Sequence, residues 1–174
     1  MTRYAAFLRG VNLGKRSVKS AELKSAFEEM GLGNVKTLLA SGNVLFDCGT
    51  AKGLQLKIET GLQAQFGFKV GTVLRTIDEL KAMVDSDPFA GERENDSQKL
   101  YVMMFAEPLP KGFELKGVAN DYEFPKMNAR DIFMIGYRKP DGAYGAGLQG
   151  IEKQLPKGML VTTRNWNTIL KAIA

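Results

Sequence analysis

Residues 38–47 constrain the fold of this chain more than any other stretch. Two apolar runs flank Gly42-Asn43, and glycine at the first of two central positions is what a type II′ turn requires. The right-handed twist of β-strands selects this turn for two-residue hairpins. The pattern therefore predicts an antiparallel hairpin with strands at residues 35–40 and 44–48, closed by a two-residue turn.

The apolar patterns around this hairpin predict the order β-α-β-β-α-β followed by a third helix, the ferredoxin-like arrangement. Strands are expected at residues 4–9 and 69–75, and Ser20 is the expected N-cap of the first helix. Gly31 and Pro88 end the first and third helices. The three predicted helical faces are Leu23, Ala26, Phe27 and Met30, then Leu54, Ile58, Leu62 and Phe66, then Ile77, Leu80 and Val84.

The second half of the chain repeats this order less clearly. Residues 90–99 hold no large apolar side chain and predict a polar linker between subdomains 1–89 and 100–174. We therefore predict an α+β protein of two ferredoxin-like subdomains, with helices packed on one face of antiparallel or mixed sheets. Its second half is expected to contain a strand at 100–106, a weak helix or turn-rich crossover at 110–118, hairpin strands at 122–124 and 132–137 around Met127-Asn128-Ala129, a helix at 148–155, a strand at 159–163 and a final helix at 166–174 that buries Ile169, Leu170 and Ile173.

The absence of histidine excludes several classes of chemistry. Ser-His and Cys-His nucleophiles need an imidazole, and with Cys48 as the only cysteine a structural zinc site is excluded as well. We predict no metal and no cofactor. No apolar run approaches the ~18 residues of a membrane span, and the N-terminus lacks the layout of a signal peptide. These features and the single cysteine predict a cytoplasmic protein without a membrane partner.

Several stretches together resemble a bacterial family known only as domain of unknown function 1697 (DUF1697). The resemblance runs nearly end to end and implies a cytoplasmic protein of two related α+β subdomains, with no established activity. Lys15 departs from the family pattern, which often has a second glycine there. The stretches that carry the resemblance are Phe7-Leu8-Arg9-Gly10-Val11-Asn12-Leu13-Gly14, Ser41-Gly42-Asn43-Val44-Leu45-Phe46, Arg75-Thr76, Asp87-Pro88-Phe89 and Thr163-Arg164-Asn165-Trp166-Asn167-Thr168.

The predicted topology brings two polar loops to one edge of the first sheet. The first two strands run parallel because a helix connects them, and the strand order 4-1-3-2 places the third strand between them. Residues 1–20 contain Arg3, Arg9, Lys15, Arg16 and Lys19 and no acidic residue, and a helix N-terminus arrives at the same edge. The residues expected to converge on an anion site there are Arg9, Asn12, Lys15, Ser41, Gly42 and Asn43.

Other interpretations of these residues stay open. Asn43 is also favoured by a tight turn, and Gly10 and Gly14 by a sharply bent loop. A phosphate-binding P-loop is rejected, because the spacing is one residue short and Arg16 replaces the magnesium-binding hydroxyl. In an RNA-recognition domain Phe7 would stack on a base, but Ser41 and Asn43 replace two of the expected aromatics and leave Phe46 alone, so Phe7 is expected in the core.

The last motif, residues 162–168, is the densest polar patch in the sequence. Asn165 or Asn167 is suited to cap the closing helix, and Trp166 to anchor that helix on the sheet. The alternative is a ligand surface that presents Arg164, Asn165, Trp166 and Asn167. Cys48 is expected to be a small apolar filler at the end of a strand.

Two functions are consistent with these features. The first is a binding protein without enzymatic activity, whose basic edge holds an anionic partner, either nucleic acid or a phosphorylated metabolite; the net charge of +5 favours it modestly. The second is a small phosphate-ester or acyl-phosphate hydrolase, by analogy with acylphosphatases, which are ferredoxin-like and need no histidine. In that case Arg9 holds the phosphoryl oxygens and Asn43 positions the attacking water.

Overall fold

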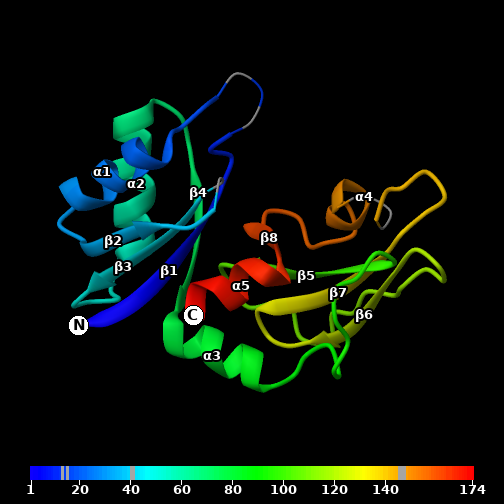
Figure 1. Cartoon of the computed structure of the whole chain (residues 1–174). Coiled ribbons are helices and arrows are strands. Elements are labelled where there is room, and N and C mark those ends of the chain that lie inside the picture. Colours follow the sequence, from blue (N-terminus) through cyan, green and yellow to red (C-terminus); the bar gives the residue numbers. More distant parts are fainter. Residues whose placement is uncertain (13, 15, 40–41, 145–147) are drawn as a thin grey trace. The chain divides into compact units, whose positions relative to one another are not determined.

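A computed structural model describes residues 1–12, 14, 16–39, 42–144 and 148–174 of this chain. The protein is mixed α+β, and its contacts divide it into a first unit of residues 1–82 and 170–174 and a second unit of residues 83–169. Figure 1 shows the elements along the chain. In order they are β1 Thr2–Arg9, α1 Ser20–Glu29, β2 Gly33–Thr37, β3 Asn43–Cys48, α2 Leu54–Phe66, β4 Gly71–Thr76, α3 Ile77–Asp85, β5 Gln98–Phe105, β6 Tyr122–Met127, β7 Asp131–Tyr137, α4 Leu148–Glu152, β8 Val161–Asn165 and α5 Trp166–Ile173.

The first sheet has four antiparallel strands in the order β2-β3-β1-β4. Read from the β4 edge, this is the order 4-1-3-2 expected from the sequence. Alternate residues of β1 point to opposite faces, so Tyr4, Ala6 and Leu8 join the core beneath the helices. Arg9 and Phe7 lie on the other face.

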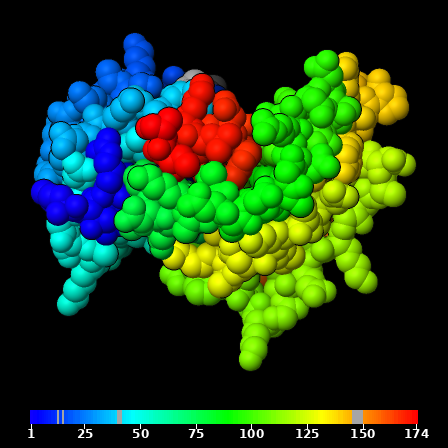
Figure 2. Space-filling view, turned by 60° about the horizontal axis from the view of Figure 1, so that its bottom comes forward, coloured from blue at the N-terminus to red at the C-terminus, as the bar shows by residue number. Residues whose placement is uncertain are grey.

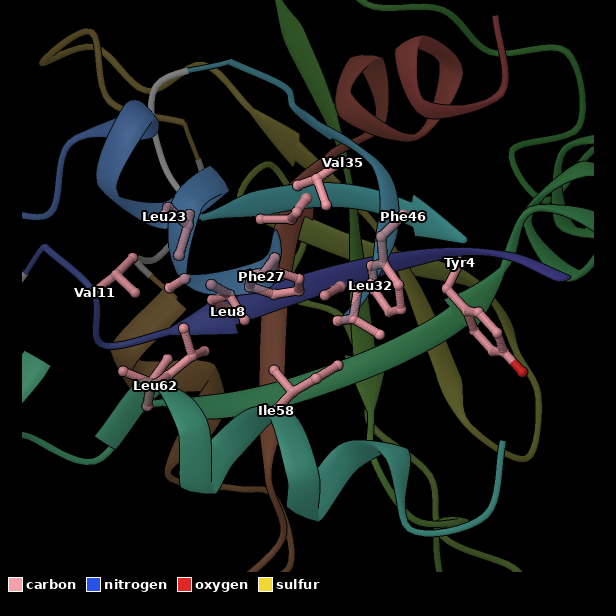
Figure 3. Close-up of a cluster of buried hydrophobic side chains, with 14 of the residues drawn as sticks. Tyr4, Leu8, Val11, Leu23, Phe27, Leu32, Val35, Phe46, Ile58 and Leu62 are labelled. Atoms are coloured by element: carbon pink, nitrogen blue, oxygen red, sulfur yellow. The ribbon is translucent and has the colours of Figure 1, made fainter. Parts of the chain in front are cut away.

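The first two helical faces predicted from the sequence pack into the core of the first unit (Figure 3). Leu23 and Phe27 of α1 and Ile58 and Leu62 of α2 point toward the side chains of the sheet. Phe27 meets Phe46 of β3 at a ring-centroid distance of 5.5 Å. The predicted N-cap of α1 is wrong by one residue, because Ser20 is already helical and Lys19 precedes it. The carboxylate of Glu22 accepts the Lys19 amide at 3.0 Å.

The predicted two-residue turn between β2 and β3 is wrong. The last pair of this hairpin is Thr37 with Val44, so six residues separate the paired positions. Asn43 already belongs to β3, and Gly42 precedes it with a φ of +68°. Leu38 donates its amide to the Asn43 carbonyl at 2.9 Å, which closes a wider loop than the sequence indicated. The loop is wider because register is set by the pairing of β3 with β1 as well as by the turn.

The second sheet also has four antiparallel strands, in the order β6-β7-β5-β8. The hairpin predicted around Met127-Asn128-Ala129 is confirmed as β6 and β7. Residues 110–118 form no helix, and of the two alternatives for this crossover the turn-rich one is present. The burial predicted for the final helix is wrong at Leu170, which is 40% exposed, whereas Ile169 and Ala172 are buried. Figure 2 shows that α5, in red, reaches the surface.

Residues 90–99 do not form the spacer predicted from the sequence. Gln98 and Lys99 belong to β5, and Gln98 is buried. Glu94 accepts the Leu100 amide at 3.1 Å, and its side chain also binds Asn165 at 2.7 Å. The contacts instead divide the chain after Ala82, so that this segment belongs wholly to the second unit. Residues 90–97 are exposed, as their polar composition indicated, and the hydrogen bonds of Glu94 tie this segment to β5 and β8.

The two units share the register of their central strands. Leu8 donates its amide to the Gly42 carbonyl at 2.8 Å, and Phe105 donates to Arg130 at 2.9 Å in the same way. Across the strands, Phe7 pairs with Asn43 and Met104 with Asp131, while Ala5 pairs with Arg75 and Val102 with Arg164. The equivalent positions are therefore Leu8 and Phe105, Arg9 and Ala106, Gly42 and Arg130, Asn43 and Asp131, and Arg75 and Arg164.

Candidate functional site

The end of β1 and the β2–β3 loop meet at one edge of the first sheet, as the sequence predicted. The hydrogen bond from Leu8 to Gly42 joins them directly. Gly42 approaches so closely that a Cβ atom there would lie 3.0 Å from Val11 Cγ2 and 3.2 Å from Leu8 Cβ. Its φ of +68° is also one that glycine adopts without strain. Gly42 is therefore required by the backbone at this junction.

Arg9 and Asn43 lie on the same face of this edge but in different environments. Asn43 faces Phe7, two residues before Arg9, which places both side chains on the face opposite α1 and α2. Arg9 is exposed, whereas Asn43 is only 4% exposed and donates its side-chain amide to the Leu38 carbonyl at 3.1 Å. Asn43 thus holds the loop together. Two further predicted residues, Lys15 and Ser41, lie outside the described residues.

The β1–α1 loop is held by its own side chains. Asn12 Oδ1 accepts the Val18 amide at 2.9 Å, and the Arg16 guanidinium donates to the Gly10 carbonyl at 3.4 Å. Gly10 has a positive φ, in line with the expectation of a sharply bent loop. The guanidinium carbon of Arg16 also lies 4.4 Å from the centroid of the Phe68 ring, a cation–π distance. Arg16 therefore connects the start of the loop with the segment that follows α2.

Next to Arg16, a groove of about 580 Å³ runs between α1 and the end of α2. Its walls combine hydroxyl, amide and carboxylate groups with two half-buried aromatic rings, those of Phe66 and Phe68. Sequence reasoning missed this groove, because Phe66 was assigned to the helical face and Phe68 to no role. The local signal was Phe66-Gly67-Phe68, two aromatic residues around the glycine that ends α2. The lining residues are Ser17, Val18, Ala21, Glu22, Ser25, Gln65, Phe66 and Phe68.

The aromatic residues of the first sheet itself are not available for stacking. Phe7 is 1% exposed and Phe46 is 0% exposed. The expectation that Phe7 belongs to the core is confirmed, and the RNA-recognition mode on the sheet face is excluded for these two rings. Cys48, also expected to be structural, is partly buried and donates its thiol to the Thr50 carbonyl.

Arg3 forms a separate ionic cluster at the other end of β1. It binds Asp47 at 2.9 Å and also donates to the Asn34 carbonyl at 3.0 Å. The side-chain amide of Asn34 donates to the other Asp47 oxygen at 2.6 Å. The hydrogen bond from Asn34 and then that from Arg3 lower the pKa of Asp47 below its usual value. The Arg3 guanidinium is thus engaged in an ion pair within the protein.

In the second unit the Trp166 ring is buried and edge-on to two others. Its centroid lies 5.1 Å from that of Phe89 and 6.0 Å from that of Phe133. The structural role expected for Trp166 is confirmed by its 9% exposure. Asn165 accepts the Asn167 amide at 2.9 Å and so caps α5, which confirms one of the two candidate caps.

Arg164 and Asn167 complete the predicted patch and differ strongly in exposure. Asn167 is exposed. Arg164 bonds Thr162 Oγ1 and the Thr163 carbonyl, and burial lowers the pKa of its guanidinium to about 10. Arg75, the equivalent residue of the first unit, is buried, whereas Arg164 is half-buried, and Arg75 donates to the Leu74 carbonyl at 2.8 Å. The four residues of this patch therefore do not form one exposed surface.

The described residues contain neither a metal-binding group of side chains nor a helix that could span a membrane. No group of three or more histidine, cysteine, aspartate or glutamate side chains is placed to hold a metal ion among them. No helix within the described ranges has the length and apolar character needed to cross a membrane.

Comparisons with known proteins bear on family and fold. A search of curated proteins found no match. Among solved structures, the conserved bacterial protein SP0830 from Streptococcus pneumoniae is similar with a TM-score of 0.70 and 24% sequence identity, over 98% of this chain and 96% of that one. This likeness shows the fold. A family model described as "Protein of unknown function (DUF1697)" matches residues 1–132, and the chain therefore belongs to the DUF1697 family.

Proposed function

We propose that this protein binds an anionic partner, nucleic acid or a phosphorylated metabolite, at the basic edge of the first sheet. The basic edge comprises Arg9, the β1–α1 loop and Gly42. The observation that carries the proposal is the Leu8–Gly42 hydrogen bond, which brings the exposed Arg9 beside the β2–β3 loop. Residues 9–20 contain four basic side chains and no acidic residue, which favours negative charge at this edge, whereas Arg3 pairs with Asp47 at the other end of β1.

The second unit supports the proposal by contrast. The position equivalent to Arg9 is Ala106, and the position equivalent to Asn43 is Asp131, a carboxylic acid. At these two positions the first unit carries a cation and a neutral amide, and the second unit a methyl group and a carboxylate; the arginine of the second unit, Arg130, stands instead at the position equivalent to Gly42. The topology shared by the two units therefore does not by itself require an arginine at the position of Arg9, because the second unit is built without one there.

The contacts of Asn43 favour binding over hydrolysis. A residue that positions an attacking water needs its polar group directed at the substrate. The side-chain amide of Asn43 is instead buried and donates to Leu38. We therefore rank second the hypothesis of an acyl-phosphate hydrolase that uses Arg9 and Asn43.

We also propose that both units are ferredoxin-like, which their strand orders support. We further propose that the protein is cytoplasmic, which its single cysteine supports.

Fluorescence anisotropy with a labelled 12-nucleotide oligo(dT), together with calorimetry on pyrophosphate, tests the binding proposal. We expect affinity for the oligonucleotide to fall with salt, with a slope of log K against log salt of about −0.7 for each phosphate contact. Arg9→Ala should weaken binding and reduce the slope by about 0.7. Arg138→Ala is the matched control, because it removes an exposed arginine from the second unit. Failure of both probes to bind at low salt would overturn the proposal.

A further inference from the structure

Arg16 connects the basic edge with the groove. Its guanidinium donates to the Gly10 carbonyl in the β1–α1 loop and also lies over the Phe68 ring, 4.4 Å from the ring centroid. One face of the Phe68 ring is therefore covered by a planar and exposed side chain rather than by the core. The ring is half-buried, so its other side is supported by the core of the first unit.

We infer that the partner of the basic edge carries a nucleobase, and that this groove receives the base on the face of Phe68. The inference rests on the proposed function. Nucleobases stack on aromatic rings and on arginine planes, and both groups are present here, with the Arg16 guanidinium over the Phe68 ring. The base either replaces the Arg16 guanidinium on Phe68 or lies against its outer side, while the phosphate remains with Arg16.

The negative charge of Glu22 determines which end of a nucleotide the groove can receive. Glu22 lines the groove, and its carboxylate repels an anion placed beside it. A neutral, planar group is compatible with that carboxylate, whereas a bare phosphate belongs on the arginine side. The groove therefore suits a ligand that is charged at one end and flat and uncharged at the other, as a nucleotide is.

The remaining walls of the groove suit the edges of a base. Ser17 and Ser25 contribute hydroxyl groups, which donate and accept, and Gln65 contributes an amide, which does the same. All three are exposed and therefore reachable from solvent. The volume of about 580 Å³ lies within the range of roughly 300–1,000 Å³ found for small-molecule sites.

Comparison of two oligonucleotides of equal charge tests this inference on the wild-type protein. One is oligo(dT) of 12 nucleotides, and the other is an abasic 12-mer with the same phosphates. Stacking of one base predicts that oligo(dT) binds about 10-fold more tightly than the abasic strand. Equal binding of the two strands would overturn the inference and leave the proposed function standing. Binding of neither strand at low salt would overturn the inference, and absence of pyrophosphate binding as well would overturn the proposed function itself.

Variants of Phe68 then locate the base. Phe68→Leu should lower oligo(dT) affinity about 10-fold, to the abasic level, and leave the abasic strand unaffected, whereas Phe68→Tyr should retain the preference. Phe124→Leu is the matched control, because it shortens a half-buried aromatic residue of the second unit. A preference for oligo(dT) that survives in folded Phe68→Leu protein would show that the base does not bind here. If thymidine 5′-monophosphate competes with oligo(dT), a free nucleotide is a ligand of the groove. If it does not compete, the ligand is a nucleic-acid strand. Either result supports the inference.

Discussion

The Leu8 amide donates to the Gly42 carbonyl at 2.8 Å, and the space beside Gly42 is filled by Leu8 and Val11. This contact fastens the β2–β3 loop to the end of β1 and thereby positions Arg9 beside it. Phe105 and Arg130 make the same backbone hydrogen bond in the second unit, where the position of Gly42 is taken by an arginine. The requirement for glycine is therefore specific to the loop of the first unit.

Gly42→Ala should destabilise the protein by about 2–3 kcal/mol, through a left-handed backbone and crowding against Val11. Gly112→Ala is the control: Gly112 also has a positive φ, but a Cβ there meets nothing within 4 Å, so about 1 kcal/mol is expected. Urea unfolding measures both. Equal losses for the two variants would contradict the close approach at Gly42.

Asn43→Ala should destabilise the protein by about 1–3 kcal/mol, because the buried Leu38–Asn43 hydrogen bond is lost. The protein should also release no phosphate from an acyl phosphate above the buffer rate, either before or after the substitution. The hydrolase hypothesis predicts the opposite pair of results: turnover in the wild-type protein, and loss of turnover with unchanged stability in the variant. Denaturant unfolding and a phosphate-release assay on the same samples distinguish them.

The Asp47 cluster should make stability depend on pH in the acid range. The folded state lowers the pKa of Asp47, so the unfolded chain binds the proton more readily. The resulting stabilisation is present above the unfolded pKa of about 4 and is lost as pH falls through the folded pKa. Asp47→Asn should therefore be less stable than wild type at pH 7, and this difference should shrink below about pH 4.

A matched variant identifies the source of that effect. Asp85→Asn removes an exposed carboxylate that has no hydrogen bond or ion pair among the described residues. Its unfolding free energy should follow that of the wild-type protein from pH 7 to pH 3 within about 0.5 kcal/mol. A difference in unfolding free energy between Asp47→Asn and the wild-type protein that stays constant with pH would refute the role of the Asn34 and Arg3 contacts.

Trp166→Ala should destabilise the protein by about 3–5 kcal/mol, because a buried ring between Phe89 and Phe133 is removed. As the only tryptophan, Trp166 should emit at short wavelength in the native state and shift to the red on denaturation. Asn167→Ala, on the exposed neighbour, should cost less than about 0.5 kcal/mol. Native emission that is already red and quenched by acrylamide would contradict the burial of the ring.

Local patterns in the sequence determined most of the elements. The spacing of Leu23 and Phe27, and of Ile58 and Leu62, predicted helical faces that are indeed buried. Other local arguments predicted that Phe7 and Trp166 are buried and that Asn165 or Asn167 caps the last helix, and the cap is Asn165. Such predictions succeed because helical and strand periodicities decide which side chains can share a face, and those periodicities are properties of neighbouring residues.

Tertiary structure decided what depends on residues far apart in the chain. The β2–β3 loop is wider than its Gly42-Asn43 pair indicated, because the register of β3 is also set by pairing with β1. The polar segment before β5 is held by hydrogen bonds from Glu94 rather than left free. The Arg16–Phe68 stack joins a loop to the end of a distant helix, and no periodicity within either segment encodes it, because its geometry exists only once the sheet and helices have packed.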